Sequence, residues 1–342
     1  MIKYLGSKRL LLPLIIELVS QLEKNGRVID LFSGTSRVGH ALKSVGYQVF
    51  SNDLNTYAAT LATCYVQSDL ETWGTIAQEY ISELNQLEGE PGYFTEKFCI
   101  ESQFFQPHNG ARVDAIREKI ERDQHPSELK AILLTSLMEA ADRVDSTCGI
   151  QMAYLKSWAS RSFNEMELRL PKLLPQAMSG KGRAYHSDAV DAVEHLSAEI
   201  AYLDPPYNQH KYLGNYHIWE TLVRWDQPEA YGIARKRVDV RSRHSSFNAK
   251  RKIASALKRV VDRLDVKHII VSFSDEGYIS KEEMVELLSS RGEVRVISQD
   301  YKRYVGAQIG IYNPSGDQVG EVSHLKNTEY LFVVSPLSSR RT

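Results

Sequence analysis

The sequence predicts an α/β fold in which a parallel sheet is interrupted by a helical insertion. Strand-like runs at residues 28–32 and 47–51 flank a helix-like stretch at 37–46, and this β-α-β pattern is typical of parallel sheets. From about residue 55 to residue 181 the apolar periodicity is helical, and strand-like runs resume only afterwards. The helical stretch therefore separates two parts of one sheet.

The remaining strands are expected after the helical stretch. Apolar runs rich in β-branched and aromatic residues occur there, and helical stretches such as 281–289 follow several of them. The runs lie at residues 183–186, 200–203, 268–273, 294–301, 307–313 and 329–334. We therefore expect residues 1–54 and 181–342 to form one domain and residues 55–180 to be inserted into it.

The 342 residues can bury a sizeable core, and their charges almost balance. Lys and Arg number 42 and Asp and Glu 43, so a nucleic-acid partner would need a locally basic surface. The three cysteines lie far apart without C-x-x-C spacing, which predicts neither a zinc site nor a disulfide framework and fits a cytoplasmic protein. Pro13 and Glu17 interrupt the apolar run near the start, which we interpret as an amphipathic helix and not as a membrane segment.

A tight turn follows the first predicted strand in the stretch VIDLFSGTSRVG, residues 28–39. Gly34 permits backbone angles and a close ligand approach that other residues do not, and Asp53 lies nineteen positions later (53 − 34). Nucleoside-binding α/β folds place a ribose-binding carboxylate about 20 residues beyond such a turn. Ser36 occupies the middle position of the pattern G-x-G-x-x-G, where glycine would let the backbone approach a pyrophosphate. The turn thus favours a nucleoside cofactor without a pyrophosphate, such as S-adenosylmethionine. The alternative is a turn that only packs helix against sheet.

An apolar strand, residues 200–203, runs directly into Asp204, Pro205, Pro206 and Tyr207. Because proline lacks a backbone N–H and fixes φ, the strand must stop here with Asp204 at its end. The carboxyl ends of parallel strands carry the ligand site, so the glycine turn, the acid after the second strand and Asp204 should converge. The Asp204 carboxylate and the Pro205 carbonyl can accept the two N–H groups of an exocyclic amine, while Tyr207 stacks on its ring. The alternative is a buried strand end with an Asx-type turn.

Five motifs occur in this order along the chain: KYLGSK (3–8), DLFSGTS (30–36), SND (51–53), HSDAVDAV (186–193) and DPPY (204–207). Together they resemble the motifs of the Dam-type, alpha-class DNA adenine-N6 methyltransferases. The resemblance implies a Rossmann-like, S-adenosylmethionine-dependent methyltransferase sheet, with the helical insertion as its target-recognition domain. It also implies that S-adenosylmethionine, converted to S-adenosylhomocysteine, contacts Tyr4, Lys8, Asp30, Phe32, Ser33, Gly34, Thr35, Ser36, Asp53, Asp188 and Asp204.

The same resemblance implies transfer of a methyl group to the exocyclic amino group of adenine in a specific duplex DNA sequence, with the target base flipped out. The catalytic set would be Asp204, Pro205, Pro206 and Tyr207, and no metal is expected. The protein would act as the modification enzyme of a restriction-modification system. Its partner would be double-stranded DNA, with a cognate restriction endonuclease acting separately and no membrane partner.

A run of cations follows the catalytic motif in the stretch RKRVDVRSRHSSFNAKRK, residues 235–252. Such a run is usually a solvated face, but its place after the catalytic strand in a nearly neutral protein favours a strip that binds DNA phosphates. The candidate DNA contacts are Lys211, Arg235, Lys236, Arg237, Arg241, Arg243, Lys250 and Arg251.

Other functions stay open at this point. Methylation of the cytosine amine or of adenine in RNA is less favoured, because the first residue of the motif is more often serine in the resembling cytosine enzymes and asparagine in the RNA enzymes. A nicotinamide-dependent oxidoreductase is disfavoured by Ser36 and by the lack of a recognisable catalytic Lys/Tyr or His set. A non-catalytic DNA-binding protein with a methyltransferase fold is disfavoured by the intact Asp204 and Tyr207.

Overall fold

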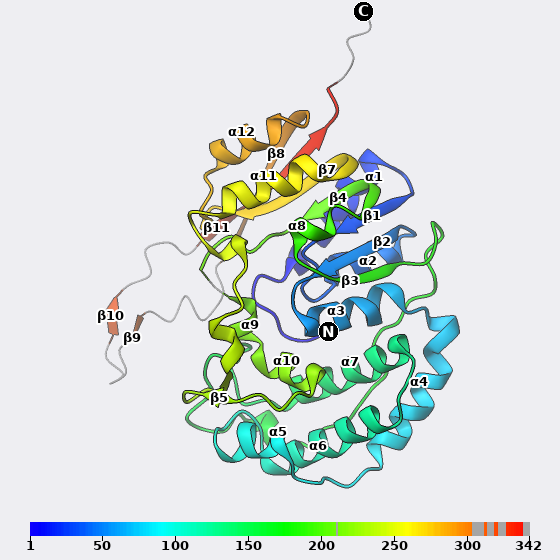
Figure 1. Ribbon diagram of the computed structural model, residues 1–342, viewed down its shortest axis with the longest axis vertical. Helices are drawn as coiled ribbons and strands as arrows, with labels where there is room; N and C mark the ends of the chain where they lie inside the picture. The colour runs from blue at the N-terminus through cyan, green and yellow to red at the C-terminus, as the bar shows by residue number, and fades with distance from the viewer. Residues whose placement is uncertain (210, 303–310, 313–317, 321–325, 338–342) are drawn as a thin grey trace, which may run out of the picture.

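The computed structural model describes residues 1–209, 211–302, 311–312, 318–320 and 326–337. Its centre is a sheet of seven strands in the order β3-β2-β1-β4-β7-β11-β8 (Figure 1). The strands are β1 (Arg27–Asp30), β2 (Gln48–Asp53), β3 (Arg183–His186), β4 (Ser197–Leu203), β7 (Asp265–Ser274), β8 (Glu293–Lys302) and β11 (Lys326–Ser335).

The sheet is mainly parallel. β1 pairs in parallel with β2 and with β4, β2 with β3, and β4 with β7. β11 is antiparallel to both of its neighbours, β7 and β8, so β8 points the same way as β7 and β11 alone among the seven is reversed. This arrangement confirms the predicted α/β fold.

The strand positions predicted from the sequence agree with those observed. Seven of the predicted runs overlap the seven strands, and the run at 183–186 coincides with β3. The predicted run at 307–313 falls mostly outside the described residues. Within it, β9 (Ile311–Tyr312) pairs with β10 (Gln318–Gly320) in a separate two-stranded sheet.

Helices cover both faces of the large sheet (Figure 1). Successive side chains of a strand point to opposite faces, so the apolar strands of this sheet need a helical layer on each face. Val28 and Ile270 belong to the apolar core on one face, and their neighbours Ile29 and Ile269 belong to the core on the other. The first face is covered by α1 (Leu12–Leu22) and α2 (Arg37–Ser44), and the second by α8 (Ala189–Ala192), α11 (Ile253–Arg263) and α12 (Lys281–Ser289).

The segment between β2 and β3 forms a helical unit with its own apolar core, on the lower side of the sheet in Figure 1. Its helices are α3 (Thr56–Ala62), α4 (Leu70–Asn85), α5 (Tyr93–Thr95), α6 (Pro107–Arg122) and α7 (Ser127–Arg143), with π-helical turns at Thr63–Gln67 and Glu96–Ile100 and a 3-10 turn at Ser160–Phe163. The helical character predicted for residues 55–180 is therefore observed.

The helical unit also includes residues from beyond position 180. α9 (Tyr212–Asn215) and α10 (His217–Arg224) follow the strand β4, and the buried side chains of Tyr216 and Trp219 belong to the core of the helical unit. A short hairpin of β5 (Ala230–Tyr231) and β6 (Lys236–Arg237) comes after them. The chain thus returns to the helical unit directly after the sequence Asp-Pro-Pro-Tyr.

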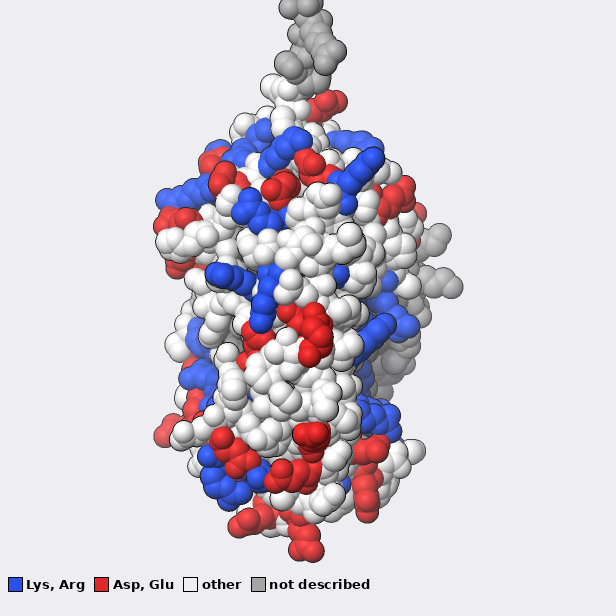
Figure 2. Space-filling model, turned by 90° about the vertical axis from the view of Figure 1, so that its right-hand side faces the viewer, with Lys and Arg blue, Asp and Glu red and all other residues white. Residues whose placement is uncertain are grey.

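The charged side chains are mixed on the surface. On the face drawn in Figure 2, Lys and Arg are interspersed with Asp and Glu among uncharged residues, in line with the nearly balanced composition. Among the described residues, no helix combines the length and the apolar character needed to cross a bilayer.

The order of the strands indicates where a ligand crevice should lie. From β1 the chain proceeds outward to β2 and β3, and then crosses to β4 on the other side of β1. In open α/β sheets, ligands bind outside the carboxyl ends of the strands at such a switch point. The ends of β1 and β4, at Asp30 and Leu203, are therefore the place to look for a site.

Gly182, directly before the edge strand β3, lies so close to neighbouring backbone atoms that no larger residue fits there without a shift. A Cβ atom at Gly182 would lie 2.6 Å from the carbonyl oxygen of Val66 and 3.0 Å from that of Val49, and neither backbone atom can rotate away. We expect Gly182→Ala to lower the free energy of unfolding by about 1–3 kcal/mol, measured by urea unfolding. Gly214→Ala is the matched control, since its Cβ would meet only Val240 Cγ1, at 3.5 Å. Equal stability of the two variants would contradict this packing.

Candidate active site

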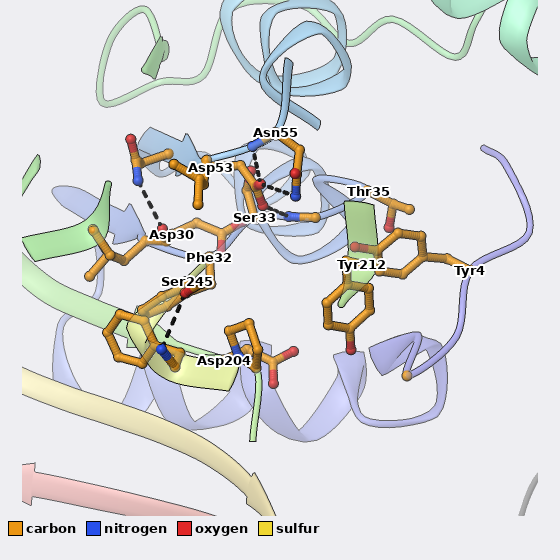
Figure 3. Close-up of a pocket in the computed structure, with 18 of the residues that line it drawn as sticks. Tyr4, Asp30, Phe32, Ser33, Thr35, Asp53, Asn55, Asp204, Tyr212 and Ser245 are labelled. Atoms are coloured by element: carbon orange, nitrogen blue, oxygen red, sulfur yellow. Dashed lines mark hydrogen bonds between the residues drawn. The ribbon is translucent and has the colours of Figure 1, made fainter. Parts of the chain in front are cut away.

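A pocket of about 1110 Å³, including the space open to solvent at its mouth, lies at the carboxyl ends of β1, β2 and β4 (Figure 3). It lies at the expected switch point. The predicted site residues that line it are Tyr4, Lys8, Asp30, Phe32, Ser33, Gly34, Thr35, Asp53, Asp188, Asp204, Pro206, Lys211 and Arg243. Ser36, Pro205 and Tyr207 do not line it, nor do the other predicted cations.

The glycine turn after β1 fixes the carboxylate of Asp53. Gly34 has a φ of 51°, which glycine adopts without strain, and a Cβ atom there would lie 3.3 Å from the hydroxyl of Tyr4. Its N–H donates to Asp53 Oδ2 at 2.9 Å, and the N–H of Asn55 donates to Oδ1 at 2.9 Å. Burial raises the pKa of Asp53, and these two hydrogen bonds oppose that rise. The carboxylate is thus held at the rim of the pocket.

The serine in the middle of the turn adopts a left-handed backbone conformation that normally favours glycine. Ser36 has a φ of 58° and precedes α2, a left-handed conformation that costs a non-glycine residue about 1–3 kcal/mol. Its buried hydroxyl has no hydrogen-bond partner among the described residues, and neither has that of Ser33. Because Ser33 lines the pocket, a polar group of a ligand can satisfy its hydroxyl.

The N-terminal segment enters the pocket through a stack of three tyrosines. The ring of Tyr4 lies between those of Tyr212, at 5.2 Å and 8°, and Tyr216, at 4.6 Å and 13°. Figure 3 shows the rings of Tyr4 and Tyr212 side by side next to Thr35. The sequence prediction did not include Tyr212 and Tyr216; the only signal was the aromatic spacing of the stretch YLGNYHIW.

The carboxylate of Asp204 is held by a buried lysine. Lys8 Nζ lies 3.1 Å from Asp204 Oδ1 and 2.5 Å from Glu329 Oε1, a residue of β11. Ser272 Oγ donates to the same oxygen of Glu329 at 2.5 Å. Burial alone would lower the pKa of Lys8, but Asp204 and Glu329 outweigh it and hold that pKa well above its usual value. Burial raises the pKa of Asp204, and the ammonium of Lys8 limits the rise.

Tyr207 lies apart from the pocket. Its ring packs edge-on against Phe273 of β7, with the ring centres 5.7 Å apart and the planes at 63°. Its carbonyl accepts a hydrogen bond from the N–H of Tyr278 at 2.9 Å. The structure therefore brings Asp204 and Pro206 to the cavity but turns the aromatic ring of the motif towards the sheet.

A third carboxylate, Asp30, lies beneath the turn. It is 1% exposed, and its Oδ2 accepts a hydrogen bond from the N–H of Gly39 at 3.1 Å. Burial, together with the charges of Asp204 and Asp53, raises the pKa of Asp30 to about 7. Three acids thus stand at the ends of β1, β2 and β4, which suits a ligand with positive charge.

Two further residues support the ends of the strands. Asn52 Nδ2 donates to the carbonyls of Leu31, at 3.2 Å, and Ser187, at 3.1 Å, and ties the ends of β1, β2 and β3 together. Asp188 caps α8 by accepting from the N–H of Val190 at 2.9 Å. Asn52 was not predicted as a site residue, although it precedes Asp53 in the motif SND.

The predicted basic strip contains two arginines that are paired within the protein. Arg237 is 2% exposed, and its guanidinium contacts both oxygens of Asp226 at 2.7 Å. Arg243 Nη1 lies 2.7 Å from Glu220, which is fully buried. Both arginines therefore pair with a carboxylate outside the run of cations, and both also contact Asp239 within it, Arg237 Nε at 3.0 Å and Arg243 Nη1 at 3.7 Å.

The remaining cations are reachable from solvent to different extents. Arg235 Nε lies 3.1 Å from Glu101, Lys236 Nζ lies 3.0 Å from Met152 Sδ, and Lys211 Nζ lies 2.7 Å from His244 Nδ1. The guanidinium of Arg241 stacks on the ring of Tyr231 at 3.9 Å. The exposed members of the predicted set are Arg241, Lys250 and Arg251.

The described residues contain no group of three or more His, Cys, Asp or Glu side chains arranged to hold a metal ion. Cys64 and Cys99 are buried and Cys148 is exposed, and none of the three forms a disulfide. Burial raises the pKa of Cys64 to about 12, so this thiol stays protonated.

Residues 4–287 match a family model described as D12 class N6 adenine-specific DNA methyltransferase. The chain is 31% identical over 323 residues to the type II methyltransferase M.FokI of Planomicrobium okeanokoites, a match over 88% of this chain and 49% of that protein. It is 30% identical over 326 residues to the modification methylase StsI of Streptococcus sanguinis, over 90% and 49%. It is 28% identical over 307 residues to the type II methyltransferase M.NlaIII of Neisseria lactamica, over 86% and 89%. The chain thus spans about half the length of the first two relatives.

From the raised pKa of Asp30 we predict how the free energy of unfolding changes with pH. With an ordinary value of 3.8 in the unfolded chain and about 7 when folded, the folded state binds more protons than the unfolded state within this window. The free energy of unfolding therefore falls as the pH rises through the window. Asp30→Asn is neutral and keeps an acceptor for the Gly39 N–H, so it should gain about 2–3 kcal/mol relative to wild type between about pH 5 and pH 8.

Urea unfolding at both pH values measures this difference. Asp191→Asn, at an exposed carboxylate of α8, is the control and should follow the wild type. The explanation is wrong if Asp30→Asn also follows the wild type.

Proposed function

Because the chain belongs to the D12 class N6 adenine-specific DNA methyltransferase family, we propose that it transfers a methyl group from S-adenosylmethionine to the exocyclic amino group of adenine in a specific duplex DNA sequence. The product of the cofactor would be S-adenosylhomocysteine. The observation that carries the proposal is one pocket in which the carboxylate of Asp53 and the strand end at Asp204 face the same space.

The pocket fits a nucleoside cofactor with a positive charge. Asp53 would bind the ribose hydroxyls chiefly through Oδ2, which keeps a lone pair beyond the bond from the Gly34 N–H, because Oδ1 already accepts from both the N–H and Nδ2 of Asn55. The unpartnered hydroxyl of Ser33 offers a further polar contact, and the ring of Phe32, packed edge-on against Phe247 at 4.9 Å, offers an apolar wall. When bound, S-adenosylmethionine supplies a methyl group attached to a cationic sulfur, which the carboxylates of Asp53 and Asp204 would favour.

The strand end would prepare the amine of the target base. Lys8 engages Asp204 Oδ1, which leaves Oδ2 to accept one N–H of the amine. Pro205 does not line the pocket, so its carbonyl would have to turn towards it to accept the other N–H. These two bonds would draw the lone pair out of the heterocycle and towards the methyl group, so positioning and electrostatics account for the rate. Pro206 would form part of the wall, and Tyr207 would leave Phe273 to stack on the entering base.

DNA would be bound by the surface beside the pocket. We assign the phosphate contacts to the exposed cations Arg241, Lys250 and Arg251, and sequence recognition to the helical unit, with the target adenine flipped out of the duplex. In this assignment residues 55–180 form the recognition region together with α9 and α10, which pack into the same core, and the rest of residues 1–54 and 181–342 forms the catalytic domain. Lys211, at the rim of the pocket, would meet the flipped nucleotide.

The names of the relatives support a role in a restriction-modification system. Two are called type II methyltransferases and one a modification methylase. We propose that this protein likewise protects cytoplasmic DNA, with a cognate endonuclease acting separately.

The activity is tested by incubating the protein with labelled S-adenosylmethionine and duplex DNA, followed by digestion to nucleosides. We expect the label in N6-methyl-2′-deoxyadenosine, and we expect Asp204→Asn to lose at least about a hundredfold in turnover, because the substitution weakens one of two acceptors for the amine. Unchanged unfolding by urea would show that the variant is folded. Label in cytosine, or in RNA in place of DNA, would support the alternative substrates, and no transfer at all would contradict the proposed activity.

The assignment of the exposed cations is tested by the salt dependence of DNA binding. Arg241→Gln combined with Arg251→Gln should make the slope of log affinity against log salt shallower by about 1.8, or about 0.9 for each phosphate that the protein no longer neutralises. The preference for the cognate site should remain, because phosphate contacts do not read sequence.

Lys24→Gln combined with Lys267→Gln is the matched control for this double variant. It makes the same change in charge at exposed positions near the amino ends of the strands, away from the pocket. An unaltered slope in the Arg241 and Arg251 variant would make the strip an ordinary solvated face.

A further inference from the structure

Glu329 is a buried acid that no motif marks. It lies on β11, opposite Ser274 of β7, and 42 positions (329 − 287) beyond the segment that matches the family. Its carboxylate is 2% exposed and accepts from both Lys8 Nζ and Ser272 Oγ. Burying a carboxylate in a sheet costs several kcal/mol in lost hydration unless its partners compensate that loss. The position of Glu329 therefore calls for a structural or functional explanation.

The reason lies in the charge count next to Asp204. Lys8 is shared between Asp204 Oδ1, at 3.1 Å, and Glu329 Oε1, at 2.5 Å. Lys8 and Asp204 alone would sum to zero, whereas the group of three carries one net negative charge. Without Glu329, the positive charge of Lys8 would cancel the carboxylate that faces the amine.

A net negative charge is what methyl transfer to an amine needs. In the reaction of the proposed function, the nitrogen–carbon bond forms while the carbon–sulfur bond breaks and sulfur keeps both electrons. Positive charge therefore moves from sulfur to the amine nitrogen, which then releases a proton to water. Negative charge beside the nitrogen stabilises this transition state more than the bound ground state, which raises kcat.

We propose that Glu329 is a positioning residue that keeps Lys8 on one oxygen of Asp204 and preserves the net negative charge of the site. This inference rests on the proposed function, because it concerns the charge that develops on the amine. It assigns to β11, the reversed strand of the sheet, a part in catalysis without contact with substrate. The other charged or titratable groups around Asp204 are Tyr202, Tyr207, Tyr212 and Asp30.

The first test is Glu329→Gln, which keeps the shape and an acceptor for Lys8 but removes the charge. We expect kcat for adenine methylation to fall about 10- to 100-fold while KM for DNA is unchanged, because the interaction is made in the transition state. Glu286→Gln, on the exposed side of α12, is the control for the same chemical change and should match the wild type.

The pH profile separates this role from simple support of the fold. Glu329 contributes to raising the pKa of Asp204, so removing its charge should lower that pKa and move the acid limb of kcat to lower pH. A fall in kcat with the limb at the wild-type pH, or no fall in kcat, would overturn the inference. Glu329→Asp keeps the charge and should keep the limb close to the wild-type position, and it provides the comparison if the glutamine variant does not fold.

A titration of the free protein distinguishes this inference from the proposed function. Carbon-13 NMR of labelled aspartates, with Asp204 assigned by Asp204→Asn, follows the carboxylate without any substrate. A lower pKa of Asp204 in Glu329→Gln, together with a wild-type protein that methylates nothing, would contradict the proposed function and leave the charge coupling in place. An unchanged pKa in a protein that methylates adenine would overturn the inference alone.

Discussion

The ammonium group of Lys8, buried between two carboxylates, joins the parts of the chain that form the pocket. It contacts Asp204 at the end of β4 and Glu329 on β11, at 3.1 and 2.5 Å. The segment that leads to it is fixed on the helical unit, where Lys3 Nζ lies 2.7 Å from Asp145 Oδ1. Removing one partner of a buried pair costs about 3–5 kcal/mol. The sheet and the helical unit therefore cannot move apart along this segment without disturbing the end of β4 at Asp204.

Much of the fold was predictable because buried strands and their ends leave local signals. The apolar runs predicted all seven strands of the sheet, and the two prolines after Asp204 marked the end of β4. Gly34 and Asp53 were predicted to meet, and the N–H of one does donate to the carboxylate of the other, at 2.9 Å. Such features depend on side-chain alternation, on proline geometry and on spacing along adjacent parallel strands, all of which a sequence displays directly.

The rest depended on partners that lie far away in the sequence. The run of cations gave no indication that Arg237 and Arg243 are neutralised from outside it, by Asp226 and by the buried Glu220. The apolar pattern of α10 predicts a buried face but not which core receives it, so its place in the helical unit was missed. Glu329, at the polar start of an apolar strand, looks like an ordinary strand end until its partners are known. Charge and hydropathy patterns predict burial, but they do not identify the contacting residue.

The position of β11 between β7 and β8 has a consequence for how the protein folds. Strands β7 and β8 are consecutive along the chain but are not neighbours in the sheet, because β11 lies between them. The hydrogen bonds that join β7 to β11 and β11 to β8 can therefore form only after β11 has been added. The ion pair of Lys8 with Glu329 spans 321 positions, a contact of very high sequence separation. Such contacts close slowly, because the entropy of a long loop must be given up before they form. During synthesis at the ribosome the Lys8–Glu329 ion pair can therefore form only when β11 docks, so a chain that has not yet reached β11 has an incomplete pocket wall.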